Sequence, residues 1–143
     1  MKYFIMKFLI CVCFTLVQAQ QESQFLGKWK TIDDETKQAK SIIEIYKKDQ
    51  VLFAKVIELL PAATIKTCNR CPGEKNGKSL LGMDIMWNMT PDNNDYSNGQ
   101  IMDPKSGKIY SCTITLEGTE KLLVRGYIGI SLFGRTQTWE RVK

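Results

Sequence analysis

The chain ends with the stretch GYIGISLFGRTQTWERVK (residues 126–143), which is the most informative segment for the fold. Chain ends usually fray and carry little information, yet this one contains Trp139, with Arg135 and Arg141 on the same side of an extended strand. A small β-barrel must bring its last strand back beside its first, because open strand edges promote aggregation. Trp29 lies on the first expected strand, and an arginine stacked over an indole contributes about 0.5–2 kcal/mol. We therefore expect a barrel that is closed by four residues, Trp29, Trp139, Arg135 and Arg141.

Apolar and polar residues alternate with a period of two along most of the chain, which is typical of β-strands with one face toward a core. We expect strands at residues 27–32, 39–46, 51–60, 98–102, 108–117, 121–127 and 135–142, and the apolar stretch 80–89 fits either a strand or a helix. Residues 61–79 contain prolines and glycines, which predict a long excursion. About eight short strands joined by hairpin-length turns indicate an all-β fold, a small antiparallel β-barrel.

The first nineteen residues have the organisation of a signal peptide. Lys2 and Lys7 precede an apolar run at residues 8–17, and Val17 and Ala19 supply the small residues that a signal peptidase reads. The run is too short to cross a membrane, so we expect no membrane span in the mature protein. The expectation is a cleaved segment 1–19 followed by a single domain, residues 20–143, that is exported to the periplasm or secreted.

The composition excludes several classes of function. Histidine is absent, which excludes Ser-His-Asp and Cys-His catalysis and histidine metal sites. The formal net charge is +5, and lysines are scattered among acidic residues, unlike the basic stripe of a nucleic-acid-binding protein. No spacing of carboxylates identifies a catalytic pair. We therefore predict no catalytic residues, no metal, no cofactor and no nucleic-acid partner, and the oligomeric state is not predicted.

The motif CNRC (residues 68–71) has the clearest chemical character. A zinc site would lack ligands, because the mature chain offers only Cys112 as a third thiolate. In an exported protein a disulfide between Cys68 and Cys71 is favoured. The alternative is a redox site in which Arg70 lowers the pKa of a neighbouring thiol. Cys112 alternates with apolar residues, so we expect it to be a buried free thiol.

Arg125 lies in the middle of an expected strand, with Tyr127 on its own face. A cation that points into a barrel needs an acidic partner or an anionic ligand. The same face turned outward would meet solvent, and the sequence leaves both orientations open. We take Arg125, Tyr127 and Tyr110 as the candidate ligand-binding residues, with an anionic ligand if Arg125 points inward.

Five stretches of the mature chain together resemble a bacterial secreted family known as domain of unknown function 2147: GKWKTID, CNRC, LLGMDIM, GQIMDPKSGKIYSC and LLVRGYIGISLFGRTQTWERV. Gly27-x-Trp29 with an arginine on the last strand is also similar to the lipocalin and fatty-acid-binding superfamily, in which a first-strand tryptophan packs against a last-strand arginine. The resemblance implies a lipocalin-like barrel and an exported protein, and it carries no activity with it.

Three hypotheses about function remain. The first is a lipocalin-like cup that binds a small apolar or amphipathic molecule, because about eight strands can enclose one such ligand. The second is an envelope or interaction protein whose barrel is filled, with residues 61–79 as its contact surface. The third, least favoured, is an enzyme that uses carboxylates or the cysteine pair.

Overall fold

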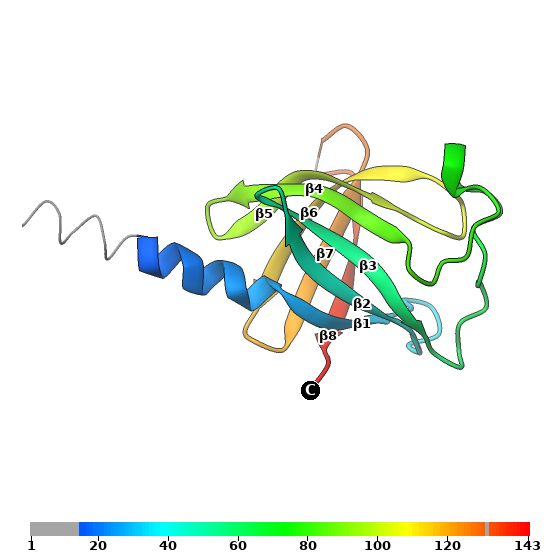
Figure 1. Cartoon of the computed structure of the whole chain (residues 1–143), viewed down its shortest axis with the longest axis horizontal. Coiled ribbons are helices and arrows are strands. Elements are labelled where there is room, and N and C mark those ends of the chain that lie inside the picture. The colour runs from blue at the N-terminus through cyan, green and yellow to red at the C-terminus, as the bar shows by residue number, and fades with distance from the viewer. Residues whose placement is uncertain (1–14, 131) are drawn as a thin grey trace, which may run out of the picture.

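Eight antiparallel strands form a closed barrel in the computed structural model, which describes residues 15–130 and 132–143 (Figure 1). The strands are β1 (Gly27–Ile32), β2 (Ala39–Lys48), β3 (Val51–Leu59), β4 (Asp84–Asp92), β5 (Asp95–Met102), β6 (Ile109–Glu117), β7 (Lys121–Tyr127) and β8 (Gly134–Arg141). Each strand pairs with the next in sequence, and β8 pairs with β1. The predicted fold class, a small antiparallel barrel of eight strands, is confirmed.

The elements outside the barrel are few. Residues 15–25 form a helix that leads into β1. A short 3₁₀ helix, η1 (Gly73–Lys75), lies within the long excursion between β3 and β4. None of the helices in the described part of the chain is long and apolar enough to cross a membrane. Residues 1–14 of the predicted signal peptide lie outside the described residues, so its cleavage stays a prediction.

The strand predictions differ from the structure mainly around residues 80–97. The ambiguous apolar stretch 80–89 does contain a strand. This strand, β4, runs from Asp84 to Asp92, so it extends beyond the apolar stretch. β5 begins at Asp95, three residues before the expected start. The two strands meet at a turn where Asn93 has a φ of 54°. Polar strand ends carry no apolar alternation, so the period-two pattern did not reveal them.

The up-and-down topology gives the barrel two different ends. One end, the closed end, carries the helix and the hairpin turns at residues 49–50, 93–94 and 118–120. The other end, the open end, carries the longer connections at residues 33–38, 60–83, 103–108 and 128–133. Figure 1 shows the helix on the left, at the closed end, and the excursion between β3 and β4 on the right, at the open end.

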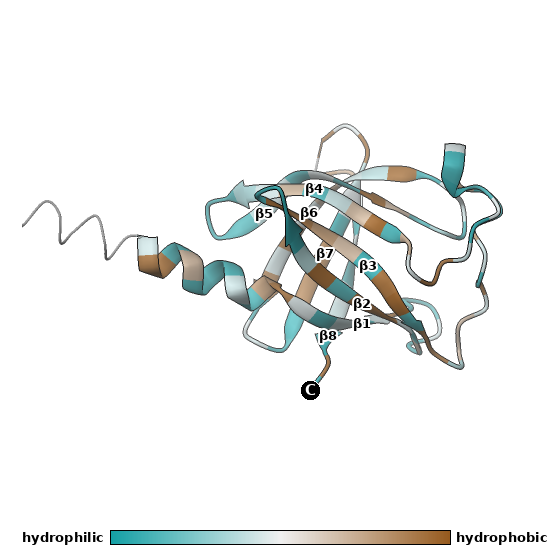
Figure 2. Cartoon of the chain, viewed as in Figure 1, coloured by the Kyte–Doolittle hydropathy of each residue, from teal (hydrophilic) through white to brown (hydrophobic). Residues whose placement is uncertain are grey.

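The closed end is filled with large apolar side chains. Trp29, Ile43, Leu52, Met86 and Ile114 are fully buried there. They alternate along their strands with residues of the outer face, and Figure 2 shows the resulting mixture of hydrophobic and hydrophilic positions along the barrel. The core at this end is therefore the ordinary consequence of period-two patterning on eight strands.

The helix closes this end by its last turn. Phe25 is fully buried and its ring lies edge-on to Tyr96, with 4.9 Å between ring centroids. The carbonyl oxygen of Phe25 accepts a hydrogen bond from the indole nitrogen of Trp29 at 2.9 Å. Glu22 pairs with Lys47 at 2.9 Å. The Gln21 amide also donates to the side-chain oxygen of Asn94 at 3.3 Å, so the contacts that hold the helix to the barrel come from residues 21–25.

The first and last strands meet in a short seam. Trp29 is the register partner of Arg141, and Thr31 is that of Trp139. The guanidinium of Arg141 lies 4.1 Å from the centroid of the Trp29 ring. It also donates hydrogen bonds to three backbone carbonyls, those of Gln24, Leu26 and Thr119. Arg141 therefore joins β8, the start of β1 and the turn before β7 at one point.

Arg135 lies at the opposite end of β8 and contacts neither tryptophan. Its guanidinium contacts one carboxylate oxygen of Asp34, in the turn after β1, through Nη2 at 2.6 Å and Nε at 2.7 Å. Arg135 and Arg141 lie near the two ends of the eight-residue strand β8, so they share a face but not a location. Both arginines thus connect β8 to the region of β1, Arg135 at the open end and Arg141 at the closed end.

Candidate functional site

The barrel interior is hollow toward the open end. A cavity of about 820 Å³ is lined by residues from all eight strands and from the four connections of the open end. Some of its lining residues, such as Glu35, Lys105 and Phe133, are exposed, so the cavity reaches the surface. The core side chains fill the closed end, so the alternative hypothesis of a filled barrel describes only that end.

The inner part of the cavity is mostly apolar. Trp139 lines its floor and is 1% exposed. Val56, Ile85 and Val124 come from three different strands and are nearly buried. Leu80 reaches the cavity from the end of the long excursion, so the excursion forms part of the wall. An apolar lining of this kind favours a ligand with an apolar body.

Neutral polar groups gather on one side of the cavity, where β8, β1 and β2 lie next to each other. Thr31 and Ser41 are cross-strand partners, and their hydroxyl oxygens are 2.9 Å apart. Gln137 lies on β8, two residues before Trp139, and its amide oxygen accepts a hydrogen bond from the Trp139 indole at 3.4 Å. All three polar residues line the cavity. The wall formed by β8, β1 and β2 can thus exchange hydrogen bonds with a ligand.

The charged residues of the lining sit at the rim. Asp33 accepts hydrogen bonds from the backbone and hydroxyl of Thr36, at 2.7 and 2.8 Å, and the backbone bond is the main reason why the pKa of this carboxyl is lowered. Lys40 donates to the carbonyl oxygen of Ala62 at 2.9 Å. The hydrogen bond from Arg135 to Asp34 is the main reason why the pKa of this guanidinium is raised. These rim charges hold the connections in place.

The structure brings two of the three predicted ligand-binding residues to the cavity. Tyr110 lines it from β6, and Tyr127, which shares the face of Arg125, borders it at the rim, where β7 ends. Arg125 lies on the outer face of β7, where it donates to the hydroxyl of Thr136 at 2.9 Å and to the carbonyl of Leu132 at 3.3 Å. Its neighbour Val124 points inward. Because successive strand residues face opposite sides, Arg125 is removed from the candidate ligand-binding residues.

Thr31, Ser41 and Gln137 are cavity residues that the sequence analysis missed. The signal was present, because Thr31 follows Trp29 by two positions and Gln137 precedes Trp139 by two. Residues two apart on a strand face the same side, so Thr31 and Gln137 point into the barrel like the two tryptophans. This spacing does not tell whether an inward residue packs in the core or lines a cavity.

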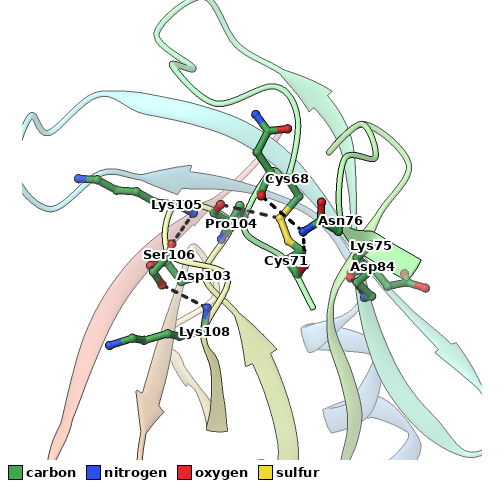
Figure 3. The surroundings of a disulfide bond; sticks show 11 residues. Cys68, Cys71, Lys75, Asn76, Asp84, Asp103, Pro104, Lys105, Ser106 and Lys108 are labelled. Carbon is green, nitrogen blue, oxygen red and sulfur yellow. Dashed lines mark hydrogen bonds between the residues drawn. A yellow bond between two sulfur atoms is a disulfide. The ribbon is translucent and has the colours of Figure 1, made fainter. Parts of the chain in front are cut away.

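A disulfide closes a tight loop within the excursion between β3 and β4, and this loop packs against the turn after β5 (Figure 3). Cys68 and Cys71 form the disulfide and are almost completely buried. The Sγ atom of Cys68 lies 3.8 Å from the carbonyl oxygen of Pro104 in the turn after β5. In the same turn Gly107 has a φ of 73°, and a β-carbon there would overlap the carbonyl group of Arg70. Only glycine fits this position.

A second contact fixes the other side of the excursion. The ammonium of Lys75 donates to the backbone carbonyl of Asp84 at 2.6 Å and lies 4.4 Å from the centroid of the Trp87 ring. Burial lowers the pKa of Lys75 despite the nearby Asp84 carboxylate. The excursion is therefore held to the barrel by close packing at Gly107 and by the hydrogen bond and cation–π contact of Lys75, whereas the disulfide constrains its own loop.

Two other features of the chain carry no site. Cys112 is a buried free thiol, and burial raises its pKa to about 12, so it stays protonated and unreactive near neutral pH. Among residues 15–130 and 132–143, no three His, Cys, Asp or Glu side chains come together in a way that could hold a metal ion.

A family model described as an uncharacterized protein conserved in bacteria, DUF2147, matches residues 27–141. The chain belongs to this family, and the resemblance drawn from its motifs is confirmed. The match begins at the first residue of β1 and ends at the last residue of β8.

A solved structure shares the fold. It is that of protein HP1028 from the human pathogen Helicobacter pylori, which is described as belonging to the lipocalin family. The TM-score is 0.72, and the match covers 82% of each chain at 17% identity. At this identity the likeness concerns the fold, which is lipocalin-like. No curated protein matches the chain.

Proposed function

We propose that this DUF2147 protein is an exported carrier that holds one small, largely apolar molecule in the cup at its open end. The observation that carries the proposal is the cavity of about 820 Å³, which reaches the surface and has an apolar floor. Ligand sites for small molecules have volumes of roughly 300–1,000 Å³. A lipocalin-like barrel of eight strands is wide enough for one such molecule, which supports the same conclusion.

Binding can be measured with the neutral fluorescent dye N-phenyl-1-naphthylamine, whose emission rises in an apolar environment. We expect saturable binding with one site, accompanied by a change in tryptophan emission because Trp139 forms the floor of the cup. The dye replaces the unknown ligand and carries no charge, so it tests the cavity alone.

Two neighbouring residues on β7 provide a matched pair of variants. Val124 lines the cavity and Leu123 lies on the outer face of the same strand. Val124→Trp should fill the cup and reduce dye affinity by about tenfold or more, whereas Leu123→Trp should leave it within about twofold. Circular dichroism checks that both variants keep the fold. Equal affinities for the two folded variants, or no dye binding by the wild type, would refute the carrier proposal.

The proposed export rests on the order of residues at the start of the chain, where positive charge, an apolar run and a Val-x-Ala site follow one another. The disulfide between Cys68 and Cys71 suits an oxidising compartment. Cleavage after Ala19 would also preserve the contacts of Glu22 and Phe25 with the barrel. N-terminal sequencing of the protein from its own host should give Gln20 as the first residue, and an intact Met1 would contradict export by this route.

A further inference from the structure

We propose that the part of the ligand inside the cup is uncharged, an amphipathic alcohol, ester or amide rather than a free carboxylate or phosphate. This inference rests on the proposed carrier function and names the chemical class of the ligand. It follows from where the charged and the neutral polar groups of the cavity lie.

The charged lining residues are at the rim, and most are already engaged by other groups. Asp33 is bound by Thr36, Lys40 by a backbone carbonyl, and Arg135 by Asp34. Asp103 accepts hydrogen bonds from the Lys105 amide at 3.0 Å and the Ser106 hydroxyl at 2.7 Å. These charged groups therefore form hydrogen bonds and an ion pair within the rim.

Two further charged residues of the lining, Glu35 and Lys105, are exposed at the outer edge. They have opposite signs and face water, so neither gives the interior a net charge. Arg125, the cation that could have balanced a buried anion, lies on the outer face of β7.

The inner polar groups are all neutral and keep hydrogen-bonding capacity. Gln137 uses its amide oxygen on the Trp139 indole, and within the described part of the chain its amide nitrogen has no partner. The same holds for the phenol of Tyr110, which lines the cavity from β6. Thr31 and Ser41 bond to each other and can still accept a bond from a ligand.

Among the cations of the lining, Lys40 and Arg135 are bonded to other groups at the rim and Lys105 is exposed at its outer edge, so the free donors deeper in the cup suit a neutral acceptor. An ester or amide oxygen can accept bonds from Gln137 and Tyr110 while the rest of the molecule covers the apolar wall. A carboxylate placed there would lose its hydration and gain no opposite charge, which makes its burial unfavourable. The cavity should thus discriminate by the charge of the ligand rather than by its length.

The test compares ligands that share one dodecyl chain and differ in the head group. Lauric acid, dodecyl phosphate and monolauroylglycerol each displace the bound dye in separate titrations of the wild-type protein. Near pH 8 the acid is ionised, since the ordinary carboxyl pKa is about 4. We expect the glycerol ester to bind at least about tenfold more tightly than either anion. The affinity for lauric acid should rise as the pH falls and the carboxyl becomes neutral.

Three variants on β8 test which residue is responsible for the preference for a neutral ligand. Gln137→Leu should weaken binding of the ester about fivefold or more, because it removes the donor and keeps the size. Thr138→Val, on the outer face of the same strand, should change no affinity. Gln137→Lys should invert the preference, because it places a cation inside the cup.

The outcomes separate the two proposals. Failure of the dye itself to bind would refute the carrier function. Dye binding with lauric acid or dodecyl phosphate as tight as the ester near pH 8 would overturn only the inference about charge. Dye that no dodecyl ligand displaces would overturn it as well.

Discussion

The two ends of the barrel are built from the same eight strands but are stabilised by different means. The closed end is held by buried aromatic rings, a helix and Arg141, with Trp29 at its centre. The open end surrounds a cavity and is held by its connections, through the disulfide, Gly107 and the contact between Arg135 and Asp34. A small barrel can leave half of its interior empty because the other half supplies the hydrophobic core.

The largest effect on this comparison is expected at the closed end. Trp29→Ala should lower the free energy of unfolding by roughly 3–5 kcal/mol, because a fully buried indole is replaced by a cavity. Trp87→Ala is the control, because this ring is half-buried on the outer surface beneath Lys75. Urea unfolding followed by circular dichroism measures both, and similar losses for the two would show that the closed end is not the main core.

Substitution of two glycines, one at each end of the barrel, distinguishes the energetic cost of a strained backbone conformation from the cost of a steric overlap. Gly107 at the open end and Gly118 at the closed end both have positive φ, but a β-carbon at Gly118 would meet nothing within 4 Å. Gly118→Ala should therefore reduce stability by about 1 kcal/mol, the usual cost of the left-handed conformation. Gly107→Ala should reduce it by roughly 2–4 kcal/mol, because the excursion must move away from the turn. Equal losses would contradict the close contact with Arg70.

Removal of the disulfide tests whether the rim is held locally. The double variant Cys68→Ser with Cys71→Ser should lose roughly 2 kcal/mol, since the closed loop is very short. Amide hydrogen exchange should become faster at residues 60–83 and stay unchanged at residues 118–120. Faster exchange at both places would mean that the disulfide stabilises the whole barrel.

The smallest effects are expected from the two arginines of β8. Arg141→Met should lower the free energy of unfolding by about 1 kcal/mol through the lost contact with the Trp29 ring. Arg135→Met should change it by less than about 0.5 kcal/mol, because its side chain is 64% exposed and surface ion pairs contribute little. Urea unfolding measures the loss of stability in both variants. A larger loss for Arg135→Met would contradict the view that Arg141 contributes more to barrel stability than Arg135.

The closed end was readily predicted from the sequence, because large apolar residues at period two indicate both strands and core. Trp29 and Trp139 were identified in this way, and Arg141 was identified from the expected stacking of an arginine over an indole. The cup was harder to predict, since a residue such as Val124 has the same pattern whether it faces other side chains or empty space. The volume of a cavity depends on how eight strands and four connections come together, and no single strand carries that information.

Arg125 illustrates a second limit. Its strand alternates so evenly that both faces contain apolar residues, and Leu123 on the outer face is as hydrophobic as Val124 on the inner face. Only the pairing of β7 with β6 and β8 determines which set points inward. The turn between β2 and β3 was expected at residues 47–50, but it is confined to residues 49–50, where Asp49 and Gln50 both have positive φ although neither is a glycine.

The pairing of β1 with β8 also sets the order of events during synthesis. The two strands that meet at the seam are the first and the last strands of the barrel to leave the ribosome, so β1 has an unpaired edge until residues 134–141 emerge. Chains grow at about 5–20 residues per second, and contacts so distant in sequence form slowly. The barrel therefore cannot close before β8 is available, and a chain that stops short of β8 is left with two exposed edges that can pair with other chains.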